Sequence, residues 1–232
     1  MSAMSLSPTP RSLPGTSVAA SSFTDMNDGA VVHIVDDDLS LCSALEGLFS
    51  TVGRTTRSYR TAGDFLNSSF TDSRGCMLID IRLPDMNGLA FHAKLAERGV
   101  RLPVVMMTGC GDIQMAVGAM KRGAVDFLLK PFRDQEMIDA VLAAIERDRR
   151  QRTAERTLSQ LQERFATLSP RQQEVMLLVT AGRLNKQVAG DLRISEITAK
   201  IHRRLAMRKM GARTLADLVR MAEALERPQE RA

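Results

Sequence analysis

Carboxylate side chains follow two short apolar runs of this sequence, and their spacing could assemble one acidic pocket. Asp36 and Asp37 come directly after the run 31–35, and Asp80 follows the run 76–79. If both runs are parallel strands, their carboxyl ends lie at the edge of the sheet where ligands bind. Clustered carboxylates repel one another, and a hard cation such as Mg²⁺ relieves that repulsion. The pattern therefore predicts a magnesium site.

A hydroxyl and an ammonium group stand at the ends of two later apolar runs. Thr108 follows the run 103–107, and Lys130 follows the run 125–129. A carboxylate in the pocket could act as a nucleophile toward phosphorus and become an aspartyl phosphate. Lys130 would then neutralise the phosphoryl oxygens, and the Thr108 hydroxyl would donate a hydrogen bond to one of them. These residue types predict phosphoryl transfer to an aspartate.

The elements that must position these groups alternate from residue 30 to about residue 146. Strands are expected at 31–35, 55–59, 76–79, 103–107 and 125–129. Apolar residues at helical spacing predict helices near 41–53, 89–99, 113–123 and 138–145. Regular βαβ alternation is typical of a parallel sheet that is covered by helices on both faces. Such a sheet would gather the polar residues named above at one crevice.

Charge and composition divide the chain into unlike parts. The net charge is −1 over residues 1–28, −3 over 29–146 and +9 over 147–232. A basic third favours a polyanion partner such as nucleic acid, and the alternative is a solvated basic face. We predict a disordered Ser-, Thr- and Pro-rich tail over 1–28, an α/β domain over 29–146, a helical linker over 147–166 and an all-α domain over 167–232.

The overall composition excludes several classes of protein. With 44% hydrophobic and 25% charged residues in 232, the chain is not collagen-like or fully disordered, and its length fits two small domains. The three cysteines show no C-x-x-C spacing, which argues against a disulfide framework or a zinc site and favours a reducing cytoplasm. No run of about 18 apolar residues exists, so no membrane partner is expected.

Capping residues predict four helices in the basic part. The expected caps are Ser169, Asn185, Ser195 and Thr214, and the helices that follow them are expected to end near 181, 192, 210 and 225. No Pro or Gly interrupts 134–168, so either one long helix or two joined helices connect the domains. That segment could be a self-association seam or a solvated linker. Two short helices, a tight turn and a third helix resemble a helix-turn-helix.

The third of these helices carries a cationic face. Lys200, Arg203 and Arg204 fall on one side of it, roughly one turn apart. Ile197 and Leu205 are expected to face the core of the domain. A cationic helix of this kind fits the major groove of DNA.

The ordered motifs of the first domain are similar to those of the receiver domain of bacterial response regulators. They are VDDD at 35–38, DIRLPDMNG at 80–88, TGCGD at 108–112 and DFLLKPF at 126–132. The resemblance implies a doubly wound, flavodoxin-like, five-stranded parallel sheet. It also implies that a sensor histidine kinase phosphorylates Asp80.

The same resemblance assigns the other residues of the pocket. Asp37 would bind Mg²⁺ directly, Asp36 directly or through water, and the Arg82 carbonyl would complete the protein ligands. The register of the strand favours Asp36 and Asp37 over Asp38 as the metal-binding pair. Thr108 and Phe127 would form a switch pair. Lys130 would pair with the phosphate, and the Lys-Pro bond that follows is usually cis in this family.

Motifs of the basic part are similar to the LuxR/FixJ class of DNA-binding domain. They are LSPRQQEV at 168–175, NKQVA at 185–189, ISEITAKIHR at 194–203 and RKMG at 208–211. The resemblance implies that base edges lie near Lys200, Ile201 and Arg204. It places phosphates near Asn185, Lys186, Thr198, His202 and Arg203. The chain departs from the usual pattern at Gln172, at Ala199 and at Arg193, which stands where a turn favours glycine.

Together the two resemblances imply a cytoplasmic DNA-binding transcriptional response regulator of the FixJ type, which is not an enzyme. Phosphorylation would promote dimerisation, binding to a two-fold promoter site and activation, with RNA polymerase as a further partner. The alternative is a phosphorylation-controlled module whose helical domain binds a protein instead of DNA. A haloacid-dehalogenase-type phosphatase also uses an aspartyl nucleophile, but that family carries an acid two residues later, where this chain has Arg82.

Overall fold

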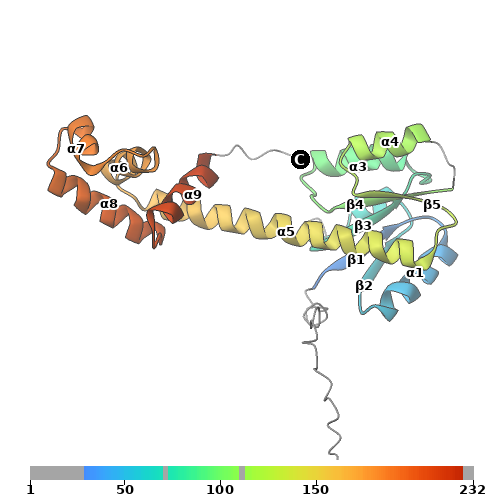
Figure 1. Ribbon diagram of the computed structural model, residues 1–232. Helices are drawn as coiled ribbons and strands as arrows, with labels where there is room; N and C mark the ends of the chain where they lie inside the picture. Colours follow the sequence, from blue (N-terminus) through green and yellow to red (C-terminus); the bar gives the residue numbers. More distant parts are fainter. Residues whose placement is uncertain (1–28, 70–72, 110–112, 227–232) are drawn as a thin grey trace, which may run out of the picture.

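The computed structural model describes residues 29–69, 73–109 and 113–226. An α/β domain and a helical domain are joined by one long helix (Figure 1). The tail predicted over residues 1–28 lies outside the described residues. Of the helices in the described part of the chain, none is long and apolar enough to cross a membrane.

The α/β domain is built on a five-stranded parallel sheet of order β2-β1-β3-β4-β5. The strands are β1 (Val31–Val35), β2 (Thr55–Tyr59), β3 (Gly75–Asp80), β4 (Val104–Thr108) and β5 (Asp126–Leu129). The three central strands are buried on both faces, which is why they appear in the sequence as nearly continuous apolar runs. The predicted five parallel strands are confirmed. The strand order reverses between β1 and β3, where a doubly wound sheet binds its ligands.

Helices cover both faces of the sheet, as predicted. They are α1 (Leu39–Thr51), α2 (Ala62–Leu66), α3 (Gly88–Glu97), α4 (Ile113–Lys121) and the first half of α5 (Asp134–Ala166). One core cluster joins α1 and α5 to the sheet through residues such as Phe49 and Met137. A second cluster on the other face includes Phe65 and Phe91 from α2 and α3.

The short helix α2 is absent from the sequence-based prediction. Five residues are too few to show a helical period. A capping box was the available signal, because the Thr61 hydroxyl accepts from the Asp64 N–H at 3.0 Å and the Asp64 carboxylate accepts from the Thr61 N–H at 3.1 Å.

Helix α5 is a single helix of 33 residues, which decides between the one-helix and two-helix alternatives. Its first half packs on the sheet. At its other end, Leu161 and Phe165 enter the core of the helical domain. The Arg164 guanidinium also donates to the Met210 carbonyl at 3.1 Å, and Lys209 Nζ donates to the Thr167 carbonyl at 2.7 Å. Each end of α5 is therefore packed into one of the two domains.

The helical domain contains the four predicted helices. They are α6 (Pro170–Thr180), α7 (Asn185–Leu192), α8 (Glu196–Met210) and α9 (Leu215–Glu226). Ser169 and Ser195 cap α6 and α8 as expected, and Gln172 closes a capping box with Ser169.

The predicted cap at Asn185 is wrong. Leu184 is the N-cap residue of α7, and its N–H is bound by Gln187 Oε1 at 2.9 Å. The Asn185 side chain instead accepts from Arg203 at 3.3 Å, an interaction with a distant residue that the local sequence does not reveal.

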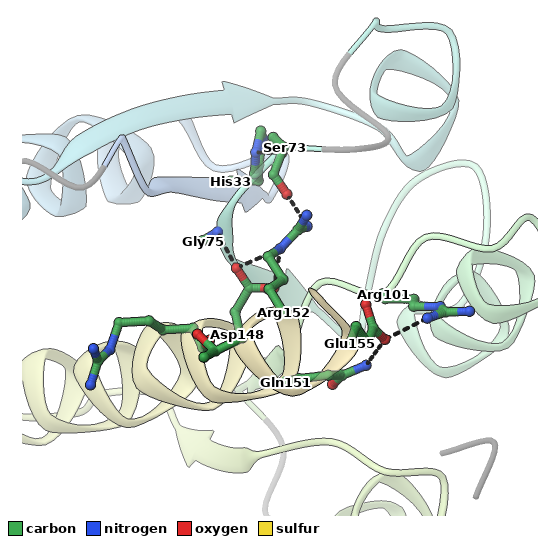
Figure 2. Close-up of polar contacts among 10 residues, drawn as sticks. His33, Ser73, Gly75, Arg101, Asp148, Gln151, Arg152 and Glu155 are labelled. Atoms are coloured by element: carbon green, nitrogen blue, oxygen red, sulfur yellow. Dashed lines mark hydrogen bonds and ion pairs between the residues drawn. The ribbon is translucent and has the colours of Figure 1, made fainter. Parts of the chain in front are cut away.

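Buried polar groups fasten α5 to the amino edge of the sheet (Figure 2). The Asp148 carboxylate, 5% exposed, accepts from the Gly75 N–H at 3.1 Å and from Arg152 Nε at 2.9 Å. Arg152 Nη2 donates to the Ser73 carbonyl at 2.6 Å. Gly75 has φ +130°, and a Cβ there would lie 1.9 Å from the Val31 carbonyl oxygen. Only glycine therefore fits at the start of β3, directly against the backbone of β1.

Replacing Asp148 with alanine is expected to lower the free energy of unfolding by about 3 kcal/mol, because the change leaves a buried amide without its acceptor and removes the carboxylate that pairs with Arg152 Nε. Urea denaturation followed by circular dichroism measures the effect. Asp139→Ala is the matched control, since Asp139 is an exposed acid on the same helix and its removal should cost less than about 0.5 kcal/mol. Equal effects of the two substitutions would contradict a structural role for Asp148.

A buried histidine is expected to make the stability of the α/β domain depend on pH. His33 has no exposed surface, and its imidazole stacks with Tyr59 and meets Phe65 edge-on. Its Nε2 lies 2.7 Å from Ser73 Oγ. Burial, assisted by the charge of Arg57, lowers the pKa of His33 from 6.5 to about 4.

As the pH falls below 6.5, the unfolded chain takes up a proton at His33, whereas the folded chain does so only near pH 4. The free energy of unfolding should therefore fall by up to about 1.4 kcal/mol per pH unit across this window. Urea denaturation at a series of pH values checks the slope. His33→Gln should flatten it, and an unchanged slope in that variant would assign the pH dependence to other groups.

Candidate functional site

Three carboxylates converge at the carboxyl ends of neighbouring strands. Asp36 and Asp37 follow β1, and Asp80 ends β3. One carboxylate oxygen from each lies within 4.8 Å of the others. Asp36 is fully buried, Asp80 is 8% exposed and Asp37 is exposed. A buried all-oxygen cluster that opens to solvent at one acid fits a hard cation such as Mg²⁺.

Asp38 does not join the cluster. Its carboxylate accepts from the Ser40 N–H at 2.9 Å and from the Leu41 N–H at 3.1 Å, so it caps α1. The Asp38 N–H in turn donates to Asp36 Oδ1 at 3.0 Å. The third acid of the VDDD motif therefore holds the helix and orients the first acid.

Lys130 reaches the cluster from the end of β5. Its Nζ lies 2.6 Å from Asp36 Oδ2 and 3.4 Å from Asp80 Oδ2. Burial opposes the charge of Lys130, but the hydrogen bond that Lys130 donates to Asp36 and the negative charges of Asp36 and Asp80 outweigh burial and raise the pKa of Lys130. Burial also raises the pKa of Asp80, although Lys130 acts in the opposite direction. The site therefore presents a partly shielded carboxylate beside a lysine that stays charged.

The remaining residues of the predicted pocket lie on β4, on β5 and in the segments that follow β3 and β5. Thr108 ends β4 and is fully buried, and its carbonyl accepts from the Lys130 N–H at 2.7 Å. Phe127 is partly buried against the core on the α3 side of the sheet. The Arg82 N–H is hydrogen-bonded to the Asp80 carboxylate, while its side chain points to solvent. The Lys130–Pro131 bond is cis, as predicted. Residues 110–112 of the TGCGD motif lie outside the described residues.

Gly88 is a residue that reasoning from the sequence did not single out. A Cβ at this position would lie 2.4 Å from the Asp80 carbonyl oxygen. Its own N–H donates to the Ile81 carbonyl at 2.9 Å. Glycine therefore lets the start of α3 pack directly behind the phosphorylation candidate. The Asn-Gly pair at 87–88, a common turn signal, was the available clue.

Cationic residues of α8 gather with α7 at one surface of the helical domain. A shallow groove of about 430 Å³ is lined by Asn185, Lys200, Arg203, Arg204, Met207, Arg208 and Ala212. Lys200 Nζ also pairs with Glu196 at 3.1 Å. The turn before α8 has Arg193 at φ +54°, the left-handed conformation in which glycine was expected. The structure therefore brings four of the predicted DNA-contacting residues together.

The other predicted DNA-contacting residues lie on the same two helices. Lys186 is exposed on α7, and Ile201 is 53% exposed on α8. The Thr198 hydroxyl is within 2.8 Å of Ser195 Oγ, at the start of α8. His202 is half-buried, and its buried Nδ1 has no hydrogen-bond partner among the described residues.

The expectation that Ile197 faces the core is wrong, because its side chain is 71% exposed. Residues Ala199, Ala206 and Met210 form the buried side of α8. Ile197 is two residues from Ala199, which places it about 200° around the helix and so on the opposite side. Leu205, the other residue expected in the core, is half-buried.

Comparison with known proteins matches both parts of the chain. The family described as "Response regulator receiver domain" matches residues 32–142, and "Bacterial regulatory proteins, luxR family" matches 166–222. Nodulation protein W of Bradyrhizobium diazoefficiens is 50% identical over 87% of this chain and 89% of its own length.

Two solved structures cover both domains. The response regulator StyR is 37% identical and superposes with a TM-score of 0.75 over 84% of this chain and 98% of StyR. Full-length FixJ from B. japonicum is 34% identical, with a TM-score of 0.54 over 84% of this chain and 97% of FixJ.

A receiver sheet with an acidic pocket, joined to a helical DNA-binding domain, defines a bacterial response regulator. The chain belongs to the response regulators with a LuxR-type DNA-binding domain, and it is a DNA-binding transcriptional response regulator. The predicted family, fold class and general function are confirmed. The alternative of a module that binds only proteins is not favoured.

Proposed function

We propose that Asp80 accepts a phosphoryl group from a sensor histidine kinase and that this modification controls DNA binding by the helical domain. The observation that carries the proposal is the approach of three carboxylates within 4.8 Å, with Lys130 Nζ 3.4 Å from Asp80. A carboxylate oxygen of Asp80 would attack phosphorus, and the bond between phosphorus and the kinase histidine would break, leaving its electron pair on the imidazole nitrogen.

The surrounding residues would hold the phosphoryl group once it is transferred. Asp36, Asp37, Asp80 and the Arg82 carbonyl are the proposed Mg²⁺ ligands, and the bound ion would neutralise negative charge on the phosphoryl oxygens. Lys130 would pair with one of these oxygens, because its Nζ already lies beside Asp80.

A switch would carry the modification to the helical domain. Thr108 would donate to a phosphoryl oxygen and Phe127 would turn inward behind it. Repacking of α4, β5 and α5 would then favour a homodimer. The continuous helix α5, with its ends packed in both domains, supports this route.

A homodimer would present two basic helical domains to a promoter site with two-fold symmetry, with activation through RNA polymerase as the outcome. We place the protein in the cytoplasm, where bacterial DNA lies. We do not regard it as an enzyme, since the phosphoryl group is transferred to its own side chain. For the domain limits we retain 29–146, 147–166 and 167–232, and the family matches at 32–142 and 166–222 support them.

The direct test incubates the full chain with acetyl phosphate and Mg²⁺ and measures the mass of the intact protein. One added phosphoryl group is expected, and it should depend on Mg²⁺. A duplex selected from a random DNA pool then serves as probe for binding by the treated and untreated protein. Tighter binding by the treated protein supports the proposal. If the protein binds Mg²⁺ but gains no phosphoryl group, the same assay is repeated with a histidine kinase as the donor. Equal DNA binding by the phosphorylated and the untreated protein would refute control by phosphorylation.

A further inference from the structure

Two exposed isoleucines lie on the outer face of α8. Ile197 is 71% exposed and Ile201 is 53% exposed, and they are one helical turn apart. Their positions exclude a role in the core, which uses Ala199, Ala206 and Met210 on the other side of the helix. Single exposed apolar residues are ordinary, but two that adjoin on one helix face form a small apolar surface.

Charged residues complete the same face of the helix. Ile197, Lys200, Ile201 and Arg204 follow the i, i+3, i+4, i+7 pattern, so they form one stripe along α8. Lys200 and Arg204 are exposed, and both line the groove of the candidate DNA-binding surface. The residues from 147 onward carry a net charge of +9. A ligand that binds this stripe should therefore be a polyanion that also has an apolar group for the two isoleucines.

The major groove of DNA meets both requirements. Phosphates and guanine edges accept from lysine and arginine, and the 5-methyl group of thymine is the apolar feature of that groove. Ile197 is the second residue of α8, and the amino-terminal residues of a recognition helix approach base edges. An isoleucine side chain cannot donate or accept a hydrogen bond, so a methyl group is the base feature it can distinguish.

We propose that Ile197, together with Ile201, recognises the 5-methyl groups of thymines in the operator. The inference rests on the proposed use of α8 as the DNA-binding helix and adds the base type that this part of the helix selects. Ile197 would thus be a specificity-determining residue.

The test removes one methyl group at a time. The full chain first selects a duplex from a random DNA pool, and each thymine of that duplex is then replaced by deoxyuridine, which lacks only the methyl group. For the wild-type protein, replacement at one or two positions per half-site should weaken binding about 4-fold, the value of one buried methyl group. Ile197→Ala should bind the unmodified duplex more weakly. Its affinity should no longer change when deoxyuridine replaces the thymine that Ile197 contacts.

Two further variants make the test specific. Ile201→Ala should lose the response at a neighbouring thymine. Leu177→Ala removes a side chain that is 47% exposed on α6, outside the stripe, and should keep the complete wild-type response. Circular dichroism checks that each variant retains its helices, which is expected because these side chains are exposed.

The outcomes separate this inference from the proposed function. If the wild type is insensitive to every replacement, or if Ile197→Ala responds as the wild type does, thymine recognition is refuted while DNA binding stands. If Ile197→Ala changes the oligomeric state instead of the thymine response, the stripe is an interface between two copies of the chain. If no duplex is selected in either phosphorylation state, DNA binding by α8 fails and this inference fails with it.

Discussion

Asp80→Asn should take up no phosphoryl group from acetyl phosphate and Mg²⁺, and its DNA binding should be the same with and without the phosphate donor. The substitution keeps the size of the side chain but removes the charge and nucleophilic oxygen on which phosphoryl transfer depends. Intact-protein mass and binding to a selected duplex measure the two effects. The change should leave the fold intact, since it removes one of three clustered negative charges.

Asp38→Asn is the matched control for this prediction. It makes the same chemical change two residues beyond Asp36, but Asp38 caps α1 and lies outside the carboxylate cluster. Asparagine caps a helix about as well as aspartate, so this variant should keep its stability and its phosphorylation. A phosphoryl group on Asp80→Asn, or its loss from Asp38→Asn, would place the acceptor chemistry elsewhere in the domain.

The double variant Lys200→Ala with Arg204→Ala should bind the selected duplex at least about 30-fold more weakly. Each side chain is placed to contact a base edge or a phosphate, and a good contact of this kind is worth about 1–3 kcal/mol. Both residues are exposed, so the helical content should not change. Fluorescence anisotropy at several salt concentrations gives the affinity, and a smaller salt slope would indicate lost phosphate contacts.

Removing two positive charges from another helix controls for a general charge effect. Arg147→Ala with Arg150→Ala also removes two positive charges, but from exposed positions on α5. Helix α5 contributes no residue to the groove. This variant should lose far less affinity than the α8 variant. Similar losses for both would mean that net charge, and not the surface of α8, accounts for binding.

Some elements could be predicted because the information for them is local. The central strands are buried on both faces and therefore show apolar runs, and Ser169 and Ser195 cap helices within a few residues of their own positions. The order of the strand-end residues was also sufficient to identify the pocket. Helix α2 was missed because its five residues are too few to show a helical period. The predicted cap at Asn185 was wrong because that side chain has a distant hydrogen-bond partner, Arg203.

The sequence by itself therefore predicted the residues that we propose carry the chemistry, and it determined the strands and helices that hold them. Tertiary structure alone decided that Lys130 lies closer to Asp36 than to Asp80, and that the Asp148 carboxylate on α5 meets the Gly75 amide. It also decided that Ile197 faces outward, because the side of α8 that is buried depends on which neighbouring helices pack against it. Periodicity and caps are local properties of the chain, whereas contacts between distant residues exist only after the elements have packed.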